Sequence, residues 1–328
     1  MTAGETARQD AAHAHGDGGA FSRMLLHIGY HKTGSTYLQD HLFQPENGFS
    51  REIGADRTRI VRDFVFPDNF CFDPEAMRQA YRPFVEAADA GGLRFVLSHE
   101  RLSGYPPSGG YDRLLIADRL ARTFPEARVL IVLREQVSLI RSVYSQYITD
   151  GGYLSLGRFL EVPEPKLGRM PGFRLELYEF DRMIRHYQAL FGRERVLVLP
   201  FEKMVRALPG FLADITGFVD LPAVKAVTEV VANQRRPMTM QLAQRWANRH
   251  FSNTELSRGG AIAIARFPRR FARLEPFFRL CTPRQVDASL HGAIERDIRA
   301  FVGAYYVESN RRTAELIDVD LGQYGYMA

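Results

Sequence analysis

Short apolar runs alternate with longer amphipathic stretches between residue 24 and residue 199. Four of the runs have the length of buried strands and cover residues 24–28, 93–98, 127–134 and 195–199. The stretches between them predict helices over residues 35–43, 74–90, 111–124, 137–147 and 176–192. A short run at residues 59–66 predicts an edge strand. This alternation predicts an α/β fold of three layers, a mainly parallel sheet with helices on both faces.

The rest of the chain has other patterns. Beyond about Met204 the periodicity is helical to Ile317, and residues 282–285 fit a capping box with proline at the first helical position. Residues 151–175 are dense in glycine and proline, which predicts a long loop. Residues 1–20 have few large apolar groups, which predicts a disordered tail. We therefore expect one domain over residues 21–328, with a helical C-terminal part from about residue 204.

Composition narrows the class of protein. The chain has 328 residues, of which 45% are hydrophobic and 25% charged, as in soluble globular proteins. The two cysteines, Cys71 and Cys281, have no spacing typical of a disulfide framework or a metal site. The opening residues do not resemble a signal peptide, and no apolar run reaches the roughly 18 residues of a spanning helix. These features predict a cytoplasmic protein, and the net charge of +5 suits anionic ligands without indicating nucleic acid.

A polar loop follows the first predicted strand. Gly29 and Gly34 bracket it, and residues 31–36 supply Lys32 and three hydroxyl groups in the loop and at the start of the next helix. Glycines let such a loop close around a ligand, and its N–H groups together with the helix N-terminus bind anions. The spacing matches the first half of the nucleotide-binding motif G-x-x-x-x-G-K-[ST], but Ser35 stands where that motif has lysine. The loop therefore predicts a phosphate site that differs from the usual triphosphate site.

Two motifs together resemble one family. Residues 31–37, His31-Lys32-Thr33-Gly34-Ser35-Thr36-Tyr37, resemble the 5′-phosphosulfate loop of sulfotransferases that use 3′-phosphoadenosine 5′-phosphosulfate (PAPS). Arg134 ends the strand predicted at 127–134, and Ser142 follows eight residues later on the next helix. This arrangement is similar to the 3′-phosphate clamp of the same family. The segment Glu308-Ser309-Asn310-Arg311-Arg312 is similar to bacterial glycan-type members.

The resemblance implies a fold, a donor and a set of contacts. It implies the P-loop-like sulfotransferase fold, with PAPS as donor and no metal required. Lys32 would stabilise the charge that develops on the leaving 5′-phosphate. The donor-binding residues would be His31, Lys32, Thr33, Gly34, Ser35, Thr36, Tyr37, Arg134 and Ser142. Arg235 and Arg236 are further candidates for donor or acceptor contacts, and Arg141 ranks below the pair Arg134 and Ser142.

The proton acceptor has two main candidates. His99 and Glu100 directly follow a predicted strand, and neighbours in an extended chain point to opposite sides, so only one can face the acceptor. Both kinds of base occur in the family, and Ser98-His99-Glu100 resembles the glycan-type segment in which glutamate is the candidate. Glu100 is therefore preferred over His99, and His31 is a third candidate whose place in the loop favours donor contact. Because ligands bind outside the carboxyl ends of parallel strands, we expect these groups and Arg134 to meet at one rim.

An arginine-rich segment lies in the C-terminal part. Residues 235–284 hold eleven arginines, no lysine and two acids, with phenylalanines interleaved. One interpretation is a solvated helical face with ordinary core aromatics. The other is a platform for a polyanionic glycan or for an anionic membrane, which would place the protein at the inner face of a membrane.

The resemblance predicts an enzyme that transfers a sulfuryl group to a hydroxyl of a carbohydrate or glycolipid acceptor. Two alternatives stay open at the level of sequence. One is a P-loop phosphotransferase that uses a nucleoside triphosphate, and the other is a non-catalytic glycan-binding module.

Overall fold

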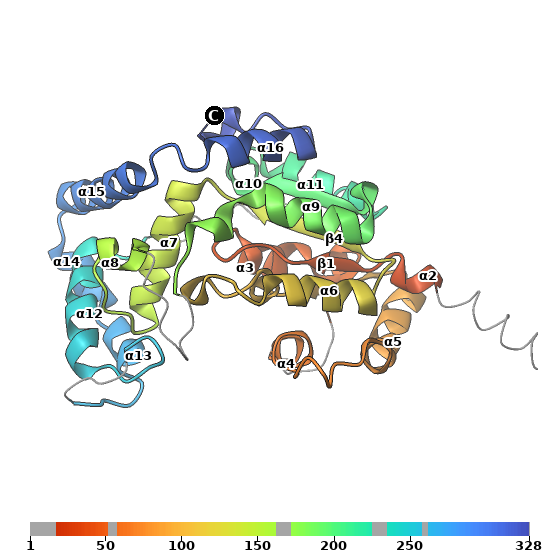
Figure 1. Ribbon diagram of the computed structural model, residues 1–328, viewed down its shortest axis with the longest axis horizontal. Helices are drawn as coiled ribbons and strands as arrows, with labels where there is room; N and C mark the ends of the chain where they lie inside the picture. Colours follow the sequence, from red (N-terminus) through yellow and green to blue (C-terminus); the bar gives the residue numbers. More distant parts are fainter. Residues whose placement is uncertain (1–17, 52–57, 162–171, 225–234, 258–261, 328) are drawn as a thin grey trace, which may run out of the picture.

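The computed structural model describes residues 18–51, 58–161, 172–224, 235–257 and 262–327 (Figure 1). Five parallel strands form one sheet in the order β2-β3-β1-β4-β5. They are β1 (Leu25–His27), β2 (Phe49–Ser50), β3 (Arg94–Ser98), β4 (Arg128–Leu133) and β5 (Val196–Pro200). The central strand β1 pairs with β3 and β4, so that His27 aligns with Ser98 on one side and Leu130 on the other. The predicted parallel sheet is confirmed.

Helices cover both faces of the sheet, as predicted (Figure 1). Those associated with the sheet are α3 (Ser35–Tyr37), which continues as a π-helical turn over Leu38–Leu42, α5 (Pro74–Ala90), α6 (Arg113–Thr123), α7 (Gln136–Thr149), α9 (Phe180–Phe191), α10 (Phe201–Arg206) and α11 (Leu208–Phe218). Short helices at the periphery are α2 (Gly18–Phe21), α4 (Arg59–Phe64) and α8 (Leu156–Leu160). The C-terminal helices are α12 (Met238–Phe251), α13 (Phe267–Ala272), α14 (Glu275–Cys281), α15 (Arg284–Val302) and α16 (Val307–Ile317).

The strands alternate strictly between two cores. In β4, Val129, Ile131 and Leu133 enter the larger core, which also holds side chains of α5, α6, α7 and α9. Leu130 and Val132, between them, enter a smaller core with side chains of α10 and α11. Successive side chains of a strand point to opposite faces, so a strand buried on both faces is apolar at every position. The unbroken apolar run in the sequence follows from this double burial.

Some predicted elements were wrong. The segment predicted as an edge strand at residues 59–66 instead holds the helix α4 (Arg59–Phe64), in which Ile60 and Phe64, four residues apart, are the buried side chains. The edge strand is β2, inside a stretch that the sequence analysis left without an element. The predicted capping box at residues 282–285 does not form either. Pro283 occupies the N-cap position of α15, and the Thr282 hydroxyl is 2.5 Å from that of Thr239.

Other boundaries moved by a few residues. The helix predicted from residue 176 begins at Phe180 after a 3₁₀ turn, and the predicted loop 151–175 contains the short helix α8. Residues 162–171 of that loop lie outside the described residues, as does the predicted tail except for its last three residues, which belong to α2. Asp73 caps α5 by accepting from two backbone N–H groups. No helix among the described residues is long and apolar enough to cross a membrane.

Candidate functional site

The loop between β1 and α3 has a buried base and an exposed crest. Tyr30 is buried against the rings of Tyr178 and Phe180, and Thr33 Oγ1 donates to the Tyr30 carbonyl at 2.6 Å. Lys32, at the crest, has a positive φ of 66°, which is uncommon for a residue with a side chain. The buried anchors thus hold Lys32 at the surface of a fixed loop.

The loop contains groups that suit a phosphate. The Ser35 hydroxyl is buried and has no hydrogen-bond partner among the described residues. A buried hydroxyl without a partner carries a desolvation cost that a ligand oxygen would remove. Gly34 has a φ of 86°, and a Cβ there would approach Met204 Sδ to 2.9 Å. Thr36 is exposed beside this turn, whereas Tyr37 packs its ring against His41.

Arg134, at the end of β4, is joined directly to the loop. Its Nη1 donates to the Lys32 carbonyl at 2.8 Å, its Nε donates to Ser138 Oγ at 3.1 Å, and its guanidinium lies over the Phe201 ring. Burial lowers the pKa of Arg134, although nearby Glu202 raises it. Ser142 lies half-buried one turn beyond Ser138 on α7 and makes no hydrogen bond to Arg134 within the described residues. The structure therefore brings Arg134 and the loop together through a bond that the sequence analysis did not predict.

Two further arginines, Arg141 and Arg235, lie near Arg134. Arg141 is buried, with Nε 3.0 Å from Glu295, and Arg235 Nη1 is 3.8 Å from the same carboxylate. Burial, with Arg235 as the next largest influence, lowers the pKa of Arg141 to about 10. Arg134 also lowers the pKa of Arg141. Such a cluster of like charges is stabilised by an anion.

Glu100 pairs with the loop. His31 Nδ1 is 3.4 Å from Glu100 Oε1, and His31 Nε2 lies 3.0 Å from the Gly104 carbonyl. Because a carbonyl oxygen only accepts, His31 Nε2 carries a proton, and Nδ1 donates to the carboxylate when it carries a proton as well. The hydrogen bond from His31 lowers the pKa of Glu100, while burial raises it. His31 thus favours the ionised form of Glu100. The neighbouring Arg101 does not pair with Glu100, because it pairs with Asp112 at 2.5 Å.

His99 caps a backbone turn. Its Nδ1 accepts a hydrogen bond from the backbone N–H of Arg101 at 3.0 Å, as the N-cap of the 3₁₀ turn Glu100–Ser103. A neutral imidazole with Nδ1 as acceptor carries its proton on Nε2. Burial lowers the pKa of His99, so the neutral form is favoured. His99 therefore offers a donor to its surroundings, where a general base needs a free lone pair.

Lys32 connects the two halves of the rim. Its Nζ is 3.4 Å from Gln146 Oε1, and Gln146 Nε2 donates to Asp150 Oδ1 at 2.8 Å. Desolvation lowers the pKa of Lys32, with Glu100 raising it and Arg134 lowering it. The neighbouring His31 pairs with Glu100, and the Lys32 carbonyl accepts from Arg134, so the structure brings Lys32, Glu100 and Arg134 to one rim.

Sequence reasoning missed Ser138, Gln146 and Asp150. Ser138, Ser142 and Gln146 follow one another at intervals of four residues along α7, and Asp150 is the C-cap of the same helix. That spacing was visible in the sequence and continues from Arg134. The described residues contain no cluster of three or more histidine, cysteine, aspartate or glutamate side chains suited to a metal ion.

Comparison with known proteins gave a structural match. No family model matches the sequence, and no curated protein matches it. The structure is similar to the crystal structure of a sulfotransferase from Alicyclobacillus acidocaldarius, with a TM-score of 0.51 and 17% sequence identity. The match covers 92% of this chain and 97% of the other. With its all-parallel sheet of five strands flanked by helices, the chain has the fold of a bacterial sulfotransferase.

Proposed function

We propose that the protein transfers a sulfuryl group from PAPS to a hydroxyl group, with a carbohydrate or glycolipid as the acceptor class. One observation carries the proposal. Arg134 donates to the carbonyl of Lys32, so a residue suited to a remote phosphate is coupled to the cationic crest of the phosphate loop. The unpartnered Ser35 hydroxyl supports a phosphate in the loop, and the arginines around Arg134 support a second anion.

The transfer forms a bond between the acceptor oxygen and sulfur and breaks the bond between sulfur and the bridging oxygen of the 5′-phosphate. The electron pair of the broken bond stays on that phosphate, where Lys32 stabilises the added charge. Glu100 accepts the proton of the hydroxyl, because its carboxylate is ionised and partly exposed, with 42% of the side chain accessible. Arg134 and its neighbours fix the position of the donor.

Thermal unfolding with two nucleotides tests the donor. Adenosine 3′,5′-bisphosphate at 100 times its dissociation constant should stabilise the fold by about 2.7 kcal/mol. ATP with magnesium should do little, and adenosine 5′-monophosphate, which lacks the 3′-phosphate, should be weaker than the bisphosphate. A preference for ATP would favour a phosphotransferase and overturn the proposal. Transfer of labelled sulfate from PAPS to a panel of glycans and glycolipids then identifies the acceptor, and glycan binding without any donor affinity would indicate a binding module.

A further inference from the structure

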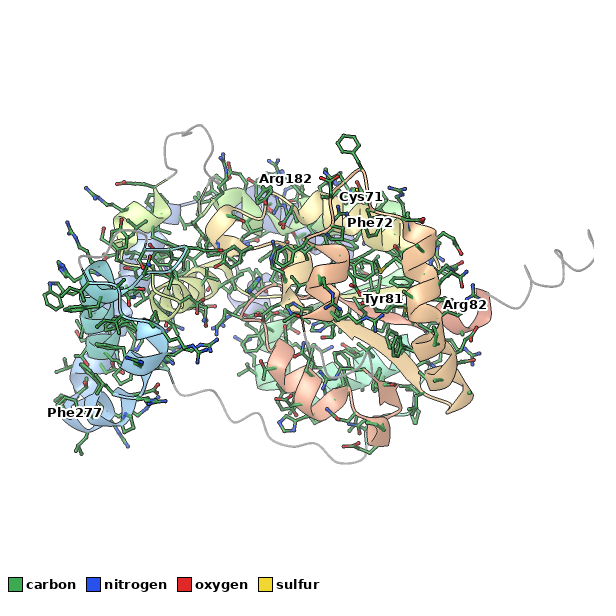
Figure 2. All side chains as sticks on the ribbon, turned by 90° about the horizontal axis from the view of Figure 1, so that it is seen from below. Cys71, Phe72, Tyr81, Arg82, Arg182 and Phe277 are labelled. Carbon is green, nitrogen blue, oxygen red and sulfur yellow. The ribbon has the colours of Figure 1, made fainter. Side chains whose placement is uncertain are left out.

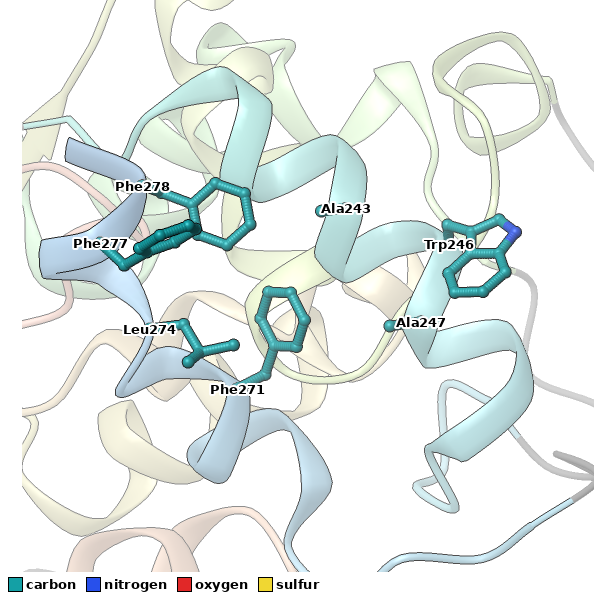
Figure 3. A pocket seen from close by; sticks show the side chains of 7 residues that line it. All are labelled: Ala243, Trp246, Ala247, Phe271, Leu274, Phe277 and Phe278. Atoms are coloured by element: carbon teal, nitrogen blue, oxygen red, sulfur yellow. The ribbon is translucent and has the colours of Figure 1, made fainter. Parts of the chain in front are cut away.

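An apolar pocket lies far from the sheet, between the C-terminal helices. It has a volume of about 550 Å³ and is formed by side chains of α12, α13 and α14 and of the turn between α13 and α14. Figure 3 shows the lining residues, which are Ala243, Trp246, Ala247, Phe271, Leu274, Phe277 and Phe278. Every one of these side chains is apolar.

The pocket opens onto a surface with large exposed apolar side chains. Trp246 is 65% exposed, Phe277 61% and Leu280 87%. Exposed apolar side chains that gather beside a pocket mark an interaction surface, because their burial would be favourable. On α12, Leu242 lies one turn before Trp246 on the same helical face and is also exposed. These groups form a site for an apolar partner.

The same helices carry unpaired cations. Arg249, Arg266, Arg269, Arg270 and Arg273 are exposed, and none forms an ion pair within the described residues. The acid nearest in sequence, Glu275, is already shared by Arg236 and Arg279. Arg249 follows Trp246 by three residues on α12, and Arg273 lies in the turn between α13 and α14, next to Leu274 of the pocket, so cations and apolar groups occur together on these helices. We name the surface of α12, α13 and α14 the Trp246 patch.

The positive charge of the Trp246 patch indicates which class of partner it binds. A second copy of this chain, in a symmetric dimer, would set the same five arginines against themselves. An anionic lipid bilayer offers phosphate groups to the arginines and acyl chains to the pocket. Tryptophan beside arginine is typical of such an interface, since both combine an apolar body with a polar end. We propose that the Trp246 patch binds the surface of an anionic lipid bilayer.

The patch is attached firmly to the rest of the molecule. Asn248, on α12, donates to the carbonyls of Ile148 and Gly152 at 2.7 and 2.9 Å, and Ile148 belongs to α7. Because α7 also carries Ser142 and Gln146, a bilayer bound at the patch would hold the candidate site at a fixed distance from the membrane.

Flotation with lipid vesicles tests whether the Trp246 patch binds an anionic bilayer. The protein should float with vesicles of phosphatidylcholine that contain roughly 30 mol% phosphatidylglycerol, which gives a strong negative surface potential. It should remain at the bottom of the gradient with vesicles of phosphatidylcholine alone. The double variant Phe277→Ser, Leu280→Ser should bind at least about tenfold more weakly. Arg270→Glu with Arg273→Glu should also lose about tenfold or more, because each arginine near such a surface contributes about fivefold. High salt should weaken the wild type.

Matched variants control for surface charge and folding. Phe70→Ser removes a fully exposed phenylalanine elsewhere, and Arg82→Glu reverses a charge on α5, at the opposite end of the molecule from Phe277 (Figure 2). Both should float like the wild type, and all variants should melt at similar temperatures. Equal flotation of patch and control variants, or equal binding to neutral vesicles, would overturn the proposal. A dimer in sedimentation that Phe277→Ser dissociates, with no flotation, would show that a second copy covers the patch.

Discussion

Lys32 and Arg134 are adjacent in space and differ in the charge that each meets. In the proposed reaction the amine of Lys32 faces charge that grows in the transition state, so Lys32→Ala should lower kcat by about 10²–10³. Arg134→Ala should weaken donor binding by roughly tenfold or more, because its contact exists before and during the reaction. Titration with adenosine 3′,5′-bisphosphate and single-turnover kinetics separate the two effects. Arg122→Ala, an exposed arginine on α6, is the control. Unchanged donor affinity in Arg134→Ala would refute the 3′-phosphate assignment.

Glu100 and His99 can be distinguished because only His99 caps a turn. Glu100→Gln should keep donor binding and lower turnover by about 10²–10⁴-fold, as expected for loss of a general base. His99→Asn keeps an acceptor for the Arg101 N–H and should remain active, whereas His99→Ala should cost about 1 kcal/mol of stability. Turnover at saturating donor, with unfolding of each variant, gives the answer. An inactive but stable His99→Asn together with an active Glu100→Gln would reverse the assignment.

At the scale of the element, the turn from β1 into α3 requires glycine at position 34. Gly34→Ala should destabilise the fold by about 1–3 kcal/mol, since its φ is positive and the added Cβ meets Met204 and Phe201. Gly92→Ala is the matched control, because Gly92 also has a positive φ of 70° but no atom within 4 Å of a Cβ. Urea unfolding should therefore show the larger loss for Gly34→Ala. Equal losses would mean that Met204 and Phe201 move aside without cost.

The sequence predicted the four main strands, because burial on both faces makes each of them a continuous apolar run. It also predicted the loop 29–34, whose glycines and lysine are local signals. The edge strand β2 was not predictable in this way, since it has two residues and is defined by pairing with Arg94 and Phe95 of β3. The pair His31–Glu100 was missed for the same reason. It joins residues from different strand ends, and only the order of strands in the sheet brings them together.

Stability of the whole molecule should depend on the buried His27. Burial lowers the pKa of His27 from 6.5 to about 4, so the unfolded chain binds its proton at a higher pH than the native state does. Stability should consequently fall as the pH decreases from about 6.5 to about 4, by a total of about 3 kcal/mol. Urea unfolding of the wild type and of His27→Asn across this range checks it. Burial also lowers the pKa of His99 and His291, so both of them reduce stability at low pH as well. The test is therefore the difference in unfolding free energy between wild type and His27→Asn, which should shrink toward pH 4.

The contact between Gln136 and Asn310 sets an order of events in the cell. Gln136 begins α7, two residues after Arg134, and its Nε2 donates to Asn310 Oδ1 at 2.6 Å across 174 positions of sequence. Asn310 Nδ2 in turn donates to the Met327 carbonyl. During synthesis, at about 5–20 residues per second, α7 emerges roughly ten seconds or more before its partner exists. Until then the side-chain amide of Gln136 lacks this partner, and a chain stalled before residue 310 should bind adenosine 3′,5′-bisphosphate more weakly than the full-length chain.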